Sequence, residues 1–255
     1  MSYFKEMLAV FQRGLVVLWR NKILLFGNLI MPFAIIIILG PAAHAQSVGD
    51  LSFKDLATGI MCMMIFFSGM FIPNNLIWDR ESGFLNIMFV SPCHRSSIIL
   101  GYSLVGAVRS TLQVVIIYIG AVLVGNSLGY NIPFGFDILI LLILLTILMT
   151  IFVGGFMTII ASFSKNSETF FLLAGMIGMP LIFLSNVFFK PENLPFGLGA
   201  LGVVNPINYL VNLVRYIILD EIPPEGPLLG LLILITTAIL FTLLGTYSFV
   251  RSAKK

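Results

Sequence analysis

The chain has 255 residues, of which 59% are hydrophobic and only 10% are Asp, Glu, Lys or Arg, and its net charge is +3. A soluble domain carries about 25% charged residues and cannot bury this much apolar surface, which excludes a soluble enzyme and a nucleic-acid-binding protein. The apolar residues form unbroken runs, such as residues 138–151, whereas a membrane β-barrel shows alternating segments of about ten residues. The sequence therefore predicts an all-α integral membrane protein.

The N-terminal residues 2–20 predict an amphipathic helix that lies in the membrane interface. Lys5, Arg13 and Arg20 fall near one stripe at helical spacing, and large apolar side chains such as Trp19 occupy the rest of the surface. Basic side chains at that depth meet lipid phosphates, and Trp favours the headgroup region. The alternative is a cytoplasmic helix that packs on another subunit.

Six apolar stretches follow, each long enough for a transmembrane helix, which needs about 20 residues. We expect spans over residues 23–43, 56–78, 97–124, 138–163, 169–189 and 227–250. An even number of spans places both termini on one side. Before the last span, the apolar stretch 207–219 is expected to form a re-entrant or helical segment that dips back toward the membrane.

The distribution of Lys and Arg predicts the orientation, because short cytoplasmic loops are enriched in both. The segments on the side of the termini hold Lys5, Arg13, Arg20, Lys22, Arg80, Arg95, Lys165, Arg251, Lys254 and Lys255, and the opposite segments hold only Lys54, Lys190 and Arg215. We therefore expect a multi-pass plasma-membrane protein with both termini in the cytoplasm.

The segment between the second and third spans, residues 79–92, is the most informative stretch outside the spans. Asp79 can cap a short helix there, acids are favoured in its first turn, and Pro92 ends it. Its body is too apolar for water, so it either docks in a groove of a partner or lies on lipid, and the residues alone leave both open. The candidate docking residues are Asp79, Arg80, Glu81, Gly83, Phe84, Leu85, Met88 and Phe89.

The chain lacks the motifs of a protein that hydrolyses ATP or binds a metal. It has no Gly-Lys dipeptide and so no phosphate-binding loop, and its two histidines, His44 and His94, are predicted on opposite sides of the membrane. We expect no catalytic residue, no cofactor and no metal site in this chain. An ion-coupled transporter usually keeps acidic residues deep in its bundle, but Asp137 and Glu168 lie at the edges of spans.

Arg109 is the one charge clearly inside a predicted span. In one interpretation it lines a pore or forms an ion pair, which is the usual role of an intramembrane charge. In the other, it extends to the inner surface from a long, partly cytoplasmic helix.

Three motifs follow one another along the chain. The first is Glu81-Ser82-Gly83-Phe84-Leu85 with Ser91-Pro92, the second runs from Pro180 to Pro195, and the third is Asn205-Pro206-Ile207-Asn208-Tyr209 with Arg215 downstream. With the basic amphipathic start and the six-span plan, their order resembles the type-2 permease family of ATP-binding-cassette (ABC) transporters. The resemblance covers essentially the whole chain and implies a single transmembrane domain over residues 1–255.

The resemblance implies a permease subunit of an ATP-driven exporter. Two copies, expected to be a homodimer, would form the substrate path by alternating access and associate with two separate ATPase subunits, which bind ATP and Mg. Residues 79–92 would be the coupling helix docked on the ATPase, with Glu81 near a basic group there. Membrane lipids are the other expected partners, and Arg109 is not a feature that the resemblance explains. The alternatives are an ion-coupled secondary transporter and a non-transport membrane subunit.

Overall fold

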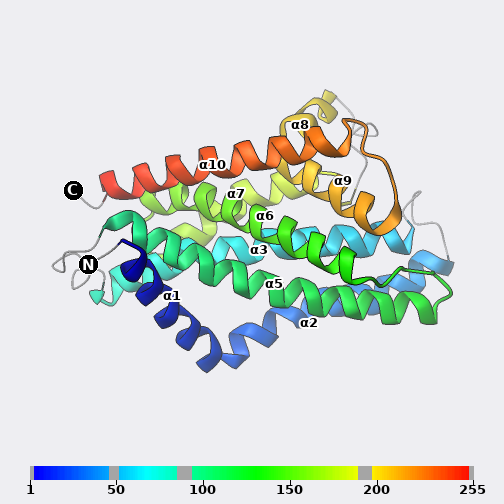
Figure 1. Cartoon of the computed structure of the whole chain (residues 1–255), viewed down its shortest axis with the longest axis horizontal. Coiled ribbons are helices and arrows are strands. Elements are labelled where there is room, and N and C mark those ends of the chain that lie inside the picture. Colours follow the sequence, from blue (N-terminus) through cyan, green and yellow to red (C-terminus); the bar gives the residue numbers. More distant parts are fainter. Residues whose placement is uncertain (1–2, 46–51, 85–93, 189–196, 253–255) are drawn as a thin grey trace.

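Helices account for most of the residues that the computed structural model describes, which are 3–45, 52–84, 94–188 and 197–252, and this part of the chain contains no strand. The helices are α1 (Tyr3–Arg20), α2 (Lys22–Ala45), α3 (Phe53–Glu81), α5 (Arg95–Ser127), α6 (Phe136–Phe163), α7 (Ser167–Phe183), α8 (Gly199–Val204), α9 (Pro206–Leu219) and α10 (Pro227–Ser252). The long helices run lengthwise, and both chain termini lie at the same end (Figure 1), here called the termini end; the other is the distal end. The prediction of an all-α protein is confirmed.

Within the described part of the chain, four helices are long and apolar enough to cross a membrane: α3, α5, α6 and α10. The 33 residues of α5 rise about 50 Å, more than the hydrocarbon thickness of roughly 30 Å, so this helix extends beyond the lipid core. Shorter apolar helical stretches are found in α2 (residues 29–38), α7 and α9. The assignment of α2 and α7 as two further spans therefore stays a prediction.

Glycines allow the backbones of α6 and α10 to pack closely together. A Cβ atom at Gly245 would overlap the backbone carbonyl of Gly155, so the two helix backbones nearly touch at this point. Beside the crossing, the Phe241 ring packs edge-on against Phe152 and Phe156, with ring centroids 5.3 and 5.4 Å apart. Small residues that let backbones approach are a common way to join helices in lipid, where burial of apolar side chains gives little driving force.

The predicted amphipathic helix is present as α1, and one of its faces packs on α5. Glu6, Val10, Gly14 and Leu18, spaced four residues apart, are buried. The opposite face keeps large apolar side chains exposed, among them Trp19 at 59%. An interface helix needs such a free apolar face, but its depth in lipid stays a prediction.

The segment before α10 folds back onto the bundle as α9. Asn205 caps this helix by accepting a hydrogen bond from the Ile207 backbone N–H, and Pro206 occupies its first turn, where a missing N–H costs nothing. The helix ends at Asp220, whose φ is 57°. Packing against α3, α6 and α10 buries most of α9.

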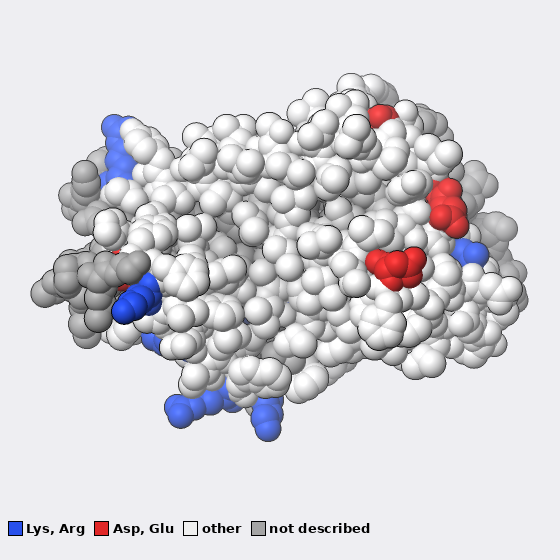
Figure 2. Space-filling view, in the orientation of Figure 1, with Lys and Arg blue, Asp and Glu red and all other residues white. Residues whose placement is uncertain are grey.

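Charged side chains separate between the two ends of the molecule. On the face drawn in Figure 2, Lys and Arg gather at the termini end and along the lower edge, whereas most of the Asp and Glu visible lie at the distal end. Lys5 and Arg251 are exposed basic residues near the two termini, and Asp220 and Glu221 are exposed acids that follow α9. The gathering of Lys and Arg at the termini end agrees with the bias of Lys and Arg read from the sequence.

Candidate functional site

Three helices meet in a charge cluster at the termini end. Arg13 on α1 donates one hydrogen bond from each terminal nitrogen, both 2.8 Å long, to the two carboxylate oxygens of Asp79 on α3. The Tyr102 hydroxyl on α5 hydrogen-bonds to the same carboxylate. Asp79 is only 7% exposed, and its hydrogen bonds raise the pKa of Arg13. Because such a two-pronged pair is directional, the cluster fixes how α1, α3 and α5 sit relative to one another.

The position of Asp79 corrects one expectation. The sequence predicts Asp79 as the cap of a new helix, but α3 continues without a break to Glu81, so Asp79 lies in the last turn of α3. Its carboxylate faces Arg13, which neutralises it. A signal was present in the sequence, since Arg13 is the basic residue in the middle of the N-terminal amphipathic segment.

α1 also holds the residues that follow the segment 85–93. The Glu6 carboxylate, 4% exposed, accepts hydrogen bonds from the His94 backbone N–H at 2.9 Å and from the Ser97 hydroxyl at 3.3 Å. The hydrogen bond from His94 holds the pKa of Glu6 below its usual value. His94 precedes α5 and makes no capping hydrogen bond with its own side chain, so Glu6 supplies the negative group that favours a helix N-terminus.

The end of α3 also contacts the corner between α6 and α7. The Arg80 guanidinium donates to the Ser164 backbone carbonyl at 3.3 Å. The Glu81 carboxylate accepts a 2.8 Å hydrogen bond from the backbone N–H of Ser167, the first residue of α7. Glu81 therefore already has a partner within the chain, whereas the sequence suggested only a basic group on another subunit.

The remaining predicted coupling residues divide between described and undescribed parts of the chain. Gly83 has a φ of 74°, in the left-handed region that favours glycine, and turns the chain after α3. The Phe84 ring lies 3.8 Å from the guanidinium carbon of Arg13. Leu85, Met88 and Phe89 lie outside the described residues.

Arg109 is buried in the middle of α5. It is 5% exposed, its guanidinium carbon lies 4.2 Å from the centre of the Phe71 ring, and it makes no ion pair with any residue that the structure describes. Its Nε and Nη2 atoms are buried and have no hydrogen-bond partner among those residues. The expectation that Arg109 extends to the surface is wrong, and no described residue forms an ion pair with it; its role in lining a pore stays a prediction.

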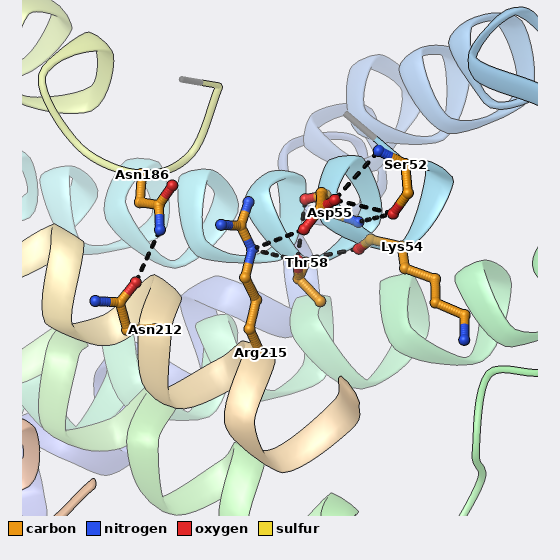
Figure 3. Close-up of polar contacts among 7 residues, drawn as sticks. All are labelled: Ser52, Lys54, Asp55, Thr58, Asn186, Asn212 and Arg215. Carbon is orange, nitrogen blue, oxygen red and sulfur yellow. Dashed lines mark hydrogen bonds and ion pairs between the residues drawn. The ribbon is translucent and has the colours of Figure 1, made fainter. Parts of the chain in front are cut away.

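A second polar cluster lies at the distal end, where α9 crosses α3. In Figure 3, Arg215 reaches from α9 toward the start of α3. Its Nε lies 3.4 Å from a carboxylate oxygen of Asp55 and donates to the Thr58 hydroxyl at 3.5 Å. Asp55 and Ser52 also form a capping box that begins α3. Arg215 is 3% exposed, so this ion pair joins two segments far apart in the sequence inside the protein.

Beside this ion pair lies a distal cavity of about 520 Å³. Asn186, which follows α7, donates to Asn212 on α9 at 2.9 Å, and Asn212 in turn donates to Glu225 at 3.2 Å. The Asn186–Asn212 contact is visible in Figure 3. Among the described residues no group of three His, Cys, Asp or Glu side chains is placed to hold a metal ion.

Comparison with known proteins identifies relatives of the chain. A model of the family described as ABC-2 type transporter matches residues 5–219, from α1 to the end of α9. The chain is 28% identical over 167 residues to a protein of Porphyra purpurea named putative transport permease ycf38, with 64% of this chain and 55% of that protein covered. It is 27% identical over 174 residues to a protein of Escherichia coli (strain K12) named probable multidrug ABC transporter permease YbhR, with 68% and 46% covered. These alignments span about half the length of the relatives.

Proposed function

Because the chain belongs to the ABC-2 type transporter family, we propose that it is the permease subunit of an ATP-driven exporter, acting as a homodimer with two separate ATPase subunits. The two copies enclose the substrate path, and the ATPase subunits bind the ATP and Mg. The names of two relatives, a transport permease and a multidrug ABC transporter permease, support the class.

The observation that carries the coupling proposal is the anchoring of the segment 85–93. Asp79 before it and His94 after it are both held by α1, and Glu81 holds the first residue of α7. A push on this segment therefore acts on α1, α3, α5 and α7 together. Packed helices move as rigid bodies between discrete arrangements, so a docked ATPase can shift the bundle through this one segment.

The proposal places the termini end in the cytoplasm, with six spans that include α2 and α7. The Lys and Arg bias toward this end supports it. In a cysteine-free background, an impermeant thiol reagent added to intact cells should label Ile222→Cys and spare Lys165→Cys; both positions are exposed. Labelling in the reverse order contradicts the orientation.

The coupling proposal is tested by truncating the apolar side chains of the segment. Met88→Ala and Phe89→Ala should each lower recovery of a co-expressed ATPase subunit, because truncating an interface anchor costs about 2 kcal/mol or more. Phe163→Ala is the matched control, since Phe163 is an aromatic residue, 76% exposed, that ends α6 at the same end of the bundle. Glu81→Ala should retain the ATPase but lower vanadate-sensitive ATP turnover, because Glu81 contacts α7 within the chain.

The outcome separates the proposal from its rivals. If Met88→Ala and Phe89→Ala keep both the ATPase and transport, the segment is a lipid-surface helix and the coupling role is wrong. If the unaltered chain transports without any ATPase and is insensitive to vanadate, an ion-coupled transporter is favoured.

A further inference from the structure

A small cavity of about 50 Å³, here called the Arg109 cavity, lies where the elbow between α1 and α2 meets α3 and α5. Most of its lining is apolar, and its polar lining residues are Asn21 at the elbow, Ser68 and Asn75 on α3, and Arg109 on α5. The Arg109 guanidinium stacks on Phe71, and two of its nitrogens have no partner among the described residues. A buried guanidinium without a hydrogen-bond acceptor costs free energy. A bound group that accepts hydrogen bonds would therefore be stabilised in this cavity.

A second buried polar side chain without a partner among the described residues lies one helical turn along α5. Gln113 is 1% exposed, and neither atom of its side-chain amide has a partner in the described part of the chain. The Ser68 hydroxyl, 3% exposed, is likewise without one. Arg109, Gln113 and Ser68 together offer several donors on neighbouring faces of α5 and α3.

A second cavity, apolar and about 550 Å³ in volume, adjoins the Arg109 cavity. Ser68 and Phe71 line both cavities, and Gln113 lines the apolar one. Its other walls come from α2, α3, α7 and the turn after α7, and they are mainly Met, Ile and Phe side chains. One molecule with a polar head and an apolar chain can therefore occupy both cavities at once.

We propose that the two cavities bind an anionic amphiphile, with its carboxylate or phosphate on Arg109 and its apolar chain between α2, α3 and α7. Arg109 is the charged residue among the side chains that line either cavity, so the head must be negative. The Arg109 cavity has room for a carboxylate-sized group or a few waters, but not for a helix of a second copy. The inference that a ligand binds here does not depend on the proposed permease function. Only its role as a substrate or regulator rests on that function.

The elbow gives the head group a route to Arg109. Asn21 and Arg109 line the same cavity, so Arg109 lies at the depth of the elbow. Arg20 and Lys22 flank Asn21 and are both exposed. If α1 lies in the membrane interface, these two cations attract anionic head groups to the entrance of the cavity.

The test is a thermal melt of the full-length permease with its ATPase in neutral detergent. The probes are palmitate, its uncharged glycerol monoester and inorganic phosphate. Palmitate should raise the melting temperature in a saturable way, because a ligand that binds only the folded state stabilises it. The monoester lacks the charge and phosphate lacks the chain, so both should shift it far less.

Two sets of variants locate the binding. Arg109→Gln should weaken palmitate binding about tenfold to a hundredfold, the usual value of a hydrogen bond to a charged group, and Arg109→Lys should retain part of the affinity. Arg251→Gln removes an exposed charge at the end of α10 and should change nothing.

The second set fills the apolar cavity. Gly27 lines this cavity, and an added Cβ there meets no atom within 4 Å, so Gly27→Leu should fold and obstruct the chain, weakening binding about tenfold. Gly175→Leu is the matched control, because Gly175 also has open space and lies outside both cavities.

Each other result overturns the inference. Equal stabilisation by phosphate means a free-anion site, equal stabilisation by the monoester means an apolar groove that ignores Arg109, and no shift with palmitate means that water alone fills the cavities. A change of dimerisation in Arg109→Gln means that a second copy covers the site. Vanadate-sensitive ATP turnover, measured on the same samples, reports separately on the proposed function.

Discussion

Two arginines are buried to nearly the same degree, but the protein surrounds them differently. Arg215 on α9 is 3% exposed and has the Asp55 carboxylate and the Thr58 hydroxyl within 3.5 Å of its Nε. Arg109 on α5 is 5% exposed and has an aromatic ring beside it, but no carboxylate among the described residues.

The difference separates a charge with a carboxylate partner from one without, although Nη2 of Arg215 also has no hydrogen-bond partner among the described residues. The Arg215–Asp55 pair joins α9 to the start of α3, so its partner is supplied when the chain folds. Arg109 makes no comparable link to any residue that the structure describes, although leaving a charge unpaired inside a protein is costly. A buried charge that folding does not satisfy is a functional-site candidate, which is how we interpret Arg109.

The largest expected effect follows from removing the carboxylate of the paired site. Asp55→Asn leaves the Arg215 cation buried with only the Thr58 hydroxyl, and we expect a loss of about 3 kcal/mol in stability. Arg215→Met should cost less, about 2 kcal/mol, because Asp55 keeps its hydrogen bonds to Ser52 at the start of α3. Thermal unfolding in neutral detergent measures both.

The double variant Asp55→Asn with Arg215→Met is the control for this prediction. It removes both charges, so it should be more stable than the sum of the two single losses predicts. Strict additivity of the two losses would show that the pair contributes no interaction energy, and the contrast with Arg109 would then disappear.

The long helices could be predicted from the sequence because unbroken apolar runs define them. The predicted spans 97–124, 138–163 and 227–250 lie within α5, α6 and α10 and end within a few residues of them. Which helix faces which could not be predicted in this way. Lipid is as apolar as a Leu or Phe side chain, so hydrophobic pattern does not distinguish a lipid-facing surface from a packed one.

The side-chain pairs at the candidate sites could not be predicted from the sequence either. The sequence draws attention to Arg109 and Arg215, but the Asp55 partner of Arg215 comes from a segment that only folding brings near. The sequence predicts Asp79 as a helix cap because acids favour the start of a helix, whereas in the structure it pairs with Arg13 on α1. Pairs between distant segments need the three-dimensional packing, and a single sequence does not contain it in readable form.

The smallest expected effect is at Arg109, and it tests the comparison most directly. If the protein itself does not satisfy this cation, replacing it with an apolar side chain of similar length removes a desolvation cost and few favourable interactions. Arg109→Met should therefore change stability in neutral detergent, without added amphiphile, by less than about 1 kcal/mol, or raise it, because exchanging buried charges for apolar groups is often neutral or stabilising. The substitution also removes the stacking of the guanidinium on Phe71, which contributes roughly 0.5–2 kcal/mol, so this loss offsets the gain from removing the buried charge and the net change stays small. Thermal unfolding of Arg109→Met and Arg215→Met, measured in parallel, tests this prediction, because both variants replace Arg with Met. A loss at Arg109 equal to that at Arg215 would mean that Arg109 has a structural partner, and the distinction between the two arginines would fail.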